Sequence, residues 1–234
     1  MRKVVMGDTS PGLEFWVQGN PAPFATRGEL PWKRTLNKSL PQYSLGSREQ
    51  GVIIDFNLAN LFPHGQPLDI DNLCEPVFSI LINKKGWFGG RRPNLYWWRA
   101  TKLETTPIGC RIQLFSTGPP SIQIPQNLVF DGYFPGPLPR NARNSHMSAW
   151  VRDTMDKRQT RLRALYLVRL RFDNTRLNIG DISTGVVKST IDCLYPVLGG
   201  NPGSPEDWRI SVLQVEKCNN NSGEGVNISI WKLD

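Results

Sequence analysis

The chain has 234 residues, an apolar fraction of 39% and 8 tryptophans, enough for a real hydrophobic core in one large or two small domains. Its 28 basic and 20 acidic residues give a net charge of +8, which favours an anionic partner such as nucleic acid. No apolar run approaches the roughly 18 residues of a membrane span, and the first residues lack the apolar region of a signal peptide. We therefore expect a cytoplasmic protein without a membrane partner.

The first half of the chain predicts several short strands and one helix. A strand from Phe15 ends in a turn at Pro21–Pro23, and the β-branched run Val52–Phe56 is typical of a strand. The remaining elements expected here are a helix at 72–83, a loop at 86–90, strands at 95–102 and 109–115, and a linker rich in Pro, Gly and Ser at 116–125.

Two carboxylates lie one residue apart ahead of the expected helix, at Asp69 and Asp71, with Asn72 beside them. In an extended segment these two side chains point to one side, and Ile70 points into the core. Convergent carboxylates offer the hard oxygen ligands that Mg²⁺ prefers. The alternative is an acidic turn in which Asp71 or Asn72 is the N-cap of the helix.

After the linker the pattern of the first half returns at an offset of about 116 residues. The turn Pro137–Pro139 repeats Pro21–Pro23, and Ile210–Lys217 repeats Leu95–Lys102, with lysine last in both. We interpret the chain as a tandem duplication of an α+β unit, with one unit at 10–118 and the other at 124–234. Two such units suit an intramolecular pseudo-dimer.

The two units differ in their acidic residues. At the local offset of about 120 that matches Leu194 with Cys74, Asp69 and Asp71 correspond to Ser189 and Ile191 in the second unit. The second unit has a later acidic pair, and the residues of the first unit that correspond to it are arginines. These pairs are Glu206-Asp207 and Arg91-Arg92.

Basic residues cluster after the second turn, and such a cluster favours salt-sensitive contacts with DNA phosphates over a merely solvated basic face. Arg91 and Arg92 either neutralise the first acidic pair or hold a phosphate. The candidate nucleic-acid contacts are Arg91, Arg92, Arg140, Arg143, Arg152, Lys157, Arg158, Arg161 and Arg163.

Two aromatic pairs, Trp87-Phe88 and Trp97-Trp98, are candidates for base stacking, with core packing as the alternative. Trp97 and Trp98 face opposite sides of the expected strand. The cysteines are far apart in sequence, so we read them as reduced thiols. They are Cys74, Cys110, Cys193 and Cys218.

The pattern resembles the RusA-type Holliday-junction resolvases. In that family a Gly-x-Pro-x-Pro turn precedes basic residues, a D-x-D-N-L motif opens a helix, and a Gly loop and an acidic pair precede the next strand. The first unit matches at Gly19–Pro23 and Asp69–Leu73, and the second at Gly136–Pro139, Gly199-Gly200 and Glu206-Asp207. The resemblance implies mixed-sheet units in a dimeric arrangement, four-way DNA junctions as ligand, and Mg²⁺-dependent cleavage in DNA recombination and repair.

The resemblance implies a site with the two motif aspartates, a later acid and a helix lysine. Asp69 and Asp71 match the first pair as metal ligands and catalytic acids, and Asp207 or Glu206 matches the later acid in the other unit. The lysine position falls on Glu75 and Tyr195, so Glu75 is a candidate third acid. We expect the half-sites of the two units to lie far apart.

Three functions follow from these observations. The first is binding of branched DNA by a RusA-like pseudo-dimer with cleavage lost or reduced, because neither unit holds a complete set. The second is an active Mg²⁺-dependent structure-selective endodeoxyribonuclease. The third is a structural subunit of a larger nucleoprotein complex.

Overall fold

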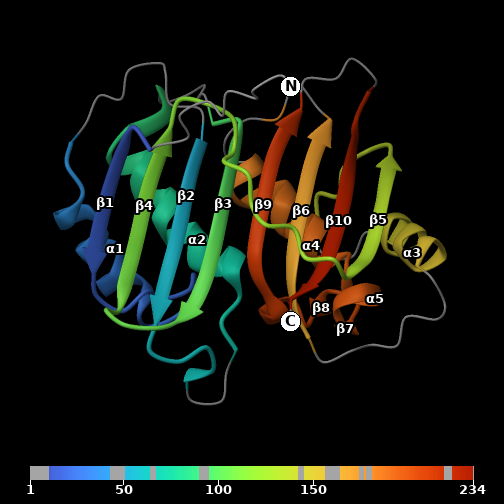
Figure 1. Ribbon diagram of the computed structural model, residues 1–234, viewed down its shortest axis with the longest axis horizontal. Coiled ribbons are helices and arrows are strands. Elements are labelled where there is room, and N and C mark those ends of the chain that lie inside the picture. The colour runs from blue at the N-terminus through green and yellow to red at the C-terminus, as the bar shows by residue number, and fades with distance from the viewer. Residues whose placement is uncertain are drawn as a thin grey trace, which may run out of the picture.

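The computed structural model describes residues 11–42, 51–63, 67–89, 95–141, 145–155, 164–173, 177, 181–218 and 223–233. Its centre is one mixed sheet with the strand order β1-β4-β2-β3-β9-β6-β10-β5. Helices α1, α2 and α4 lie behind this sheet in Figure 1. The expected α+β class is therefore confirmed.

Most neighbouring strands of this sheet are antiparallel, and β2/β3 and β6/β9 are the parallel pairs. Their bounds are β1 Leu13–Gln18, β2 Gly51–Leu58, β3 Trp97–Glu104, β4 Gly109–Phe115, β5 Leu128–Pro135, β6 Leu165–Asp173, β9 Ile210–Cys218 and β10 Gly225–Leu233. A separate small hairpin is formed by β7 Gly200–Asn201 and β8 Ser204–Pro205.

The helical segments are short and several are irregular. They are α1 Glu29–Ser39, α2 Ile70–Phe78, the π-helical η2 Ser79–Lys84, the 3₁₀ turn η3 Trp87–Gly89, α3 Ser145–Thr154, the π-helical η4 Asp181–Gly185, α4 Val186–Asp192, α5 Tyr195–Leu198 and the 3₁₀ turn η5 Asp207–Arg209.

Most expected strands are confirmed. They form because their apolar residues are buried in the sheet core. In β2, Val52, Ile54 and Phe56 are fully buried. Elements that were not expected include α1, α3 and β5. The polar composition of α1 hides a narrow apolar stripe, in which only Trp32 and Leu36 are buried.

The two halves of the sheet have the same internal order, β1-β4-β2-β3 and β5-β10-β6-β9. They meet at one antiparallel strand pair, β3 with β9, whose register runs from Trp97 opposite Glu216 to Thr101 opposite Val212. We call this pairing the seam. The connection from β4 to β5 crosses the face of the sheet turned to the viewer in Figure 1, where the Trp97 Nε1–H donates to the Thr117 carbonyl at 2.8 Å.

The aromatic residues suggested for base stacking are in the core. Trp87 and Trp98 have no exposed surface, and Trp97 and Phe88 are each 3% exposed, so the stacking prediction is wrong for both pairs. Trp97 and Trp98 do lie on opposite faces of β3, since Trp97 packs with Phe115 and Trp98 packs with Phe78. Bulky rings at these positions fill the space beside the seam.

All four cysteines are free, and Cys74, Cys110 and Cys193 are buried. Among the described residues, no helix is long and apolar enough to cross a membrane.

Trp98 ties the two halves together, because its Nε1–H donates to the Ile182 carbonyl at 2.6 Å. Trp98→Phe should lower the free energy of unfolding by about 1–3 kcal/mol, since it leaves that carbonyl unpaired and a small cavity. Trp16→Phe is the matched control, because Trp16 is 41% exposed and its change should cost under about 0.5 kcal/mol. Urea unfolding of both variants measures the difference, and equal losses would contradict this role for Trp98.

Candidate active site at the seam

The acidic motif forms the first turn of α2. Asp69 is the N-cap residue, with an extended backbone at φ −81° and ψ 133°, and the helix begins at Ile70. The alternative in which Asp71 or Asn72 caps the helix is therefore wrong. Ile70 is fully buried, as expected, and Asp71 is only 6% exposed.

The Gly-x-Pro-x-Pro turn is fixed to this helix by a proline. Pro76 lies inside α2 and has no N–H, so the carbonyl of Asn72 lacks its helical partner. The Phe24 N–H donates to that carbonyl at 2.9 Å instead. The turn and the acidic motif, far apart in sequence, thus lie side by side.

The acids of the two halves meet at the seam. Asp207, the first residue of η5, is 8% exposed and shares a side-chain hydrogen bond with Asp69. The negative charge of Asp71 repels the carboxylates of Asp69 and Asp207. It also repels the carboxylate of Asp192, a residue of α4. The expectation that the half-sites lie far apart is therefore wrong. The β3/β9 pairing places the start of β9, which follows Asp207, beside the end of β3 and α2.

Burial and mutual repulsion disfavour full ionisation of this group. Burial, reinforced by the charges of Asp71 and Asp69, raises the pKa of Asp207 to about 8. Burial and the charge of Asp71 likewise raise the pKa of Asp69. Burial also raises the pKa of Asp192, although Lys188 opposes this. A cation entering the group would relieve the repulsion.

Lys188 of α4 supplies one cation. Its Nζ donates to Asp71 Oδ2 at 3.0 Å and to Asn72 Oδ1 at 3.2 Å. Burial lowers the pKa of Lys188, but the Asp71 charge and hydrogen bond, with Asp192 and Asp207, raise it to about 12. This ammonium is therefore charged across the physiological range and pairs with an acid from the other half of the chain.

Lys102 at the end of β3 is the second cation and is only 3% exposed. Its Nζ donates to the carbonyls of Leu68 and Trp208, which are the sequence neighbours of Asp69 and Asp207. Burial lowers its pKa to about 8, against the opposing charges of Asp69, Asp207 and Asp71. Lys102 therefore fixes the backbone on which both acids are carried.

The chemistry of the donors fits a divalent metal ion such as Mg²⁺. Asp71 Oδ1 is buried without a hydrogen-bond partner, and the neighbouring donors are hard carboxylate oxygens. Within the described part of the chain, no group of three His, Cys, Asp or Glu side chains has the geometry of a metal site as it stands. Binding would require Asp207 to release the proton with which it hydrogen-bonds Asp69.

Two predicted acids lie beside the group and not in it. Burial raises the pKa of Glu75, whose strongest charged neighbours are Lys33 and Glu29 of α1. Glu206 turns to form an ion pair with Arg209. The later acid of the group is thus Asp207.

The described basic candidates already have protein partners. Arg140 pairs with Asp181 at 3.0 Å and keeps 63% of its side chain exposed, and Arg152 donates to the Tyr195 hydroxyl. The remaining candidates lie outside the described residues. These are Arg91, Arg92, Arg143, Lys157, Arg158, Arg161 and Arg163.

The second half repeats one contact of the first. Lys217 Nζ donates to the Leu177 carbonyl at 2.7 Å, as Lys102 does to that of Leu68. The charge of Asp181, the first residue of η4, acts on Lys217 as that of Asp69 acts on Lys102. Ile182 is 1% exposed, like Ile70.

Asp181-Ile182-Ser183 thus lies near Lys217 in a similar way to Asp69-Ile70-Asp71 near Lys102. Ser189 and Ile191, which the sequence comparison matched with the two aspartates, lie inside α4.

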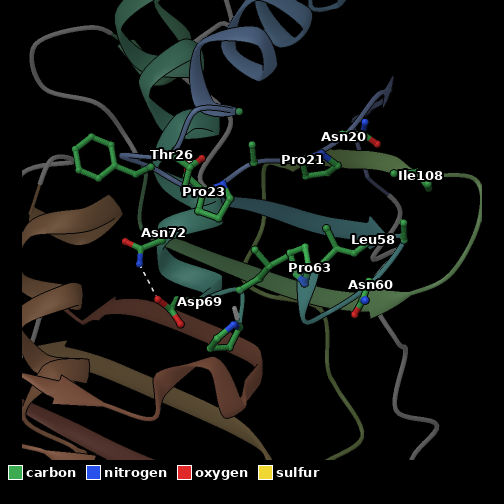
Figure 2. A pocket seen from close by; sticks show the side chains of 16 residues that line it. Asn20, Pro21, Pro23, Thr26, Leu58, Asn60, Pro63, Asp69, Asn72 and Ile108 are labelled. Carbon is green, nitrogen blue, oxygen red and sulfur yellow. Dashed lines mark hydrogen bonds between the residues drawn. The ribbon is translucent and has the colours of Figure 1, made fainter. Parts of the chain in front are cut away.

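A pocket of about 570 Å³ opens beside the acidic group (Figure 2). It lies between the Gly-x-Pro-x-Pro turn and the connection from β2 to α2. Asp69 and Asn72 lie at one end of it in Figure 2, and Asn20, Asn60 and Ile108 at the other.

Three members of the group, Lys102, Lys188 and Asp192, were not among the predicted site residues. Lys102 could have been found from the sequence, because a charged residue at the end of an otherwise apolar strand indicates a buried partner. Nothing in the sequence near Lys188 or Asp192 indicates their partners, because those lie in the other half of the chain.

Comparisons of the chain with protein-family models and with curated proteins find no match.

The Lys188–Asp71 pair should stabilise the fold measurably. Lys188→Met leaves a buried carboxylate unpaired and should lower the free energy of unfolding by about 1–2 kcal/mol, less than the ~3–5 of a fully buried pair. The discount follows from the 41% exposure of the Lys188 side chain. Arg140→Met, which breaks a more exposed pair, should cost under about 0.5 kcal/mol. Urea titration in EDTA compares them, and an equal or smaller loss for Lys188→Met would contradict the assignment.

Proposed function

We propose that the chain is a RusA-like protein of two tandem units that binds branched DNA and cleaves it with Mg²⁺. The observation that carries this proposal is the convergence of Asp69, Asp71 and Asp207 from opposite sides of the seam. The duplication is supported by the identical strand order of the two halves and by the matching Lys102 and Lys217 contacts.

The acids and lysines have the chemistry of a phosphodiesterase. Asp69, Asp71 and Asp207 would hold the metal ion, which supplies activation of water and stabilisation of charge on the phosphate. Lys188, half-exposed and charged, is placed to contact an anionic phosphate beside Asp71. Lys102 donates to backbone carbonyls and acts as a positioning residue.

Cleavage is favoured over DNA binding alone by the composite site. The expectation of lost or reduced activity was based on the incomplete acidic set in each unit. That expectation loses its basis because the acids of the two units lie next to each other, as the hydrogen bond between Asp69 and Asp207 indicates. Binding without cleavage and a structural role in a nucleoprotein complex are the competing outcomes, and a cytoplasmic location stays a prediction.

The first test is cleavage of a labelled four-way DNA junction in Mg²⁺, with binding measured on a native gel. Asp71→Asn and Asp207→Asn should each reduce the cleavage rate by at least about 100-fold, since each removes a charge that holds the ion. Junction binding in Ca²⁺ should remain. Asp153→Asn, an exposed acid of α3, is the matched control.

Junction binding without cleavage by the wild type would favour a DNA-holding protein. Equal affinity for junction and duplex DNA would favour the role of a structural subunit in a nucleoprotein complex.

The proposed protein should cut one strand per binding event. A homodimer has two equal sites by symmetry, but here Ser183 stands where the first half has Asp71, and Asp181 is paired with Arg140. The sequence also has Arg91 and Arg92 where the second half has Glu206 and Asp207.

A supercoiled plasmid with an extruded cruciform measures the number of cuts. One cut gives open circles and two paired cuts give linear molecules, so we expect open circles as the main early product. Linear product formed at the same rate as open circles would require a second site.

A further inference from the structure

The pocket beside Asp69 is lined mainly by apolar side chains from two segments that the Phe24–Asn72 hydrogen bond holds together. Its walls include Pro21, Pro23, Leu58, Pro63 and Ile108. Its volume of about 570 Å³ lies within the roughly 300–1,000 Å³ range of small-ligand sites. The pocket is thus large enough for one ring system with its sugar.

The polar groups of the pocket suit the edge of a neutral ring. Asn60 Oδ1 accepts the Phe62 N–H at 2.7 Å, so the amide NH₂ of Asn60 is the part that can donate to a ligand. Asn20 contributes a second amide (Figure 2). Amides of this kind pair with the donor and acceptor edges of nucleobases.

The charges of the pocket argue against a bare phosphate as its occupant. The described residues that line it include no lysine or arginine, and Asp69 is acidic. A phosphate there would be buried without a counter-charge. A flat, neutral ring with polar edges matches the lining better.

Phe24 supplies an aromatic surface at the same pocket. Its side chain is 44% exposed, although its backbone N–H is fixed to Asn72. An exposed ring held beside a nucleic-acid site is a stacking platform for an unpaired base.

We propose that this pocket receives one unstacked nucleobase of the strand whose phosphodiester lies at Asp69. The inference rests on the proposed function, since the acidic group locates the strand. Bases at a branch point are the cheapest to unstack, so the pocket selects opened junctions over continuous duplex. Base capture would also hold the phosphate beside Asp69 and Asp71 in register.

The test uses four-way junctions in which each nucleotide next to the branch point is replaced in turn by an abasic residue. Dissociation constants are measured in Ca²⁺ in place of Mg²⁺, so that binding is followed without turnover. Ala59, which is exposed and lines the pocket, is changed to fill it in Ala59→Trp or to leave it open in Ala59→Ser. Circular dichroism checks the fold of both variants.

The wild type and Ala59→Ser should lose about tenfold in affinity when one particular base is missing, a loss within the range of one stacking contact. Ala59→Trp should bind the intact junction at that weaker level and show no further loss with the abasic one. Phe24→Ala, which removes the stacking surface, should show a partial loss of the same selectivity.

Equal wild-type affinity for all abasic junctions would overturn the pocket assignment while leaving junction cleavage intact. The same holds if Ala59→Trp retains full selectivity for the base. If the wild type binds no junction, the proposed function fails first, and the pocket inference fails with it.

Discussion

The arrangement at the seam depends on one buried ammonium group. Lys102 donates to the carbonyls of Leu68 and Trp208, and these carbonyls belong to different halves of the chain. Because the lysine is 3% exposed, its desolvation is tolerable only with acceptors and negative charges around it. The same contacts orient the peptide units that carry Asp69 and Asp207. The position of the acids therefore follows from the hydrogen bonds that the buried ammonium group of Lys102 makes.

The acidic group opposes stability. Burial and proximity raise the pKa of Asp69, Asp192 and Asp207, and Asp71 Oδ1 has no hydrogen-bond partner. An apolar or neutral set of side chains would fill this space at lower cost. Strained electrostatics of this kind concentrate at functional sites, where the missing partner is supplied by a ligand. The structure around the group, from Trp98 to the seam strands, is correspondingly well packed.

Sequence patterns predicted what depends on local order. Strands β2, β4 and β9 follow from runs of apolar residues, and burial of Ile70 follows from its place in the motif. The pairing of Lys188 with Asp71 could not be predicted, since it depends on the register of β3 with β9, which nothing local encodes. The match of Ser189 and Ile191 with the two aspartates took the spacing from the surrounding sequence, whereas π-helical turns of different length lie in this part of each half.

On the proposed duplication, the seam explains how one half could lose its acids without losing the fold. The second half keeps the structural contacts, namely its strand pairing and the hydrogen bond from Lys217 to the Leu177 carbonyl. The carboxylate side chains contribute little to these contacts, so a change from an aspartate to Ser183 removes charge repulsion and leaves the backbone in place. An arginine such as Arg140 can then neutralise the remaining Asp181. A homodimer cannot diverge in this way, because each substitution appears at both sites, whereas a duplicated chain can specialise one of them.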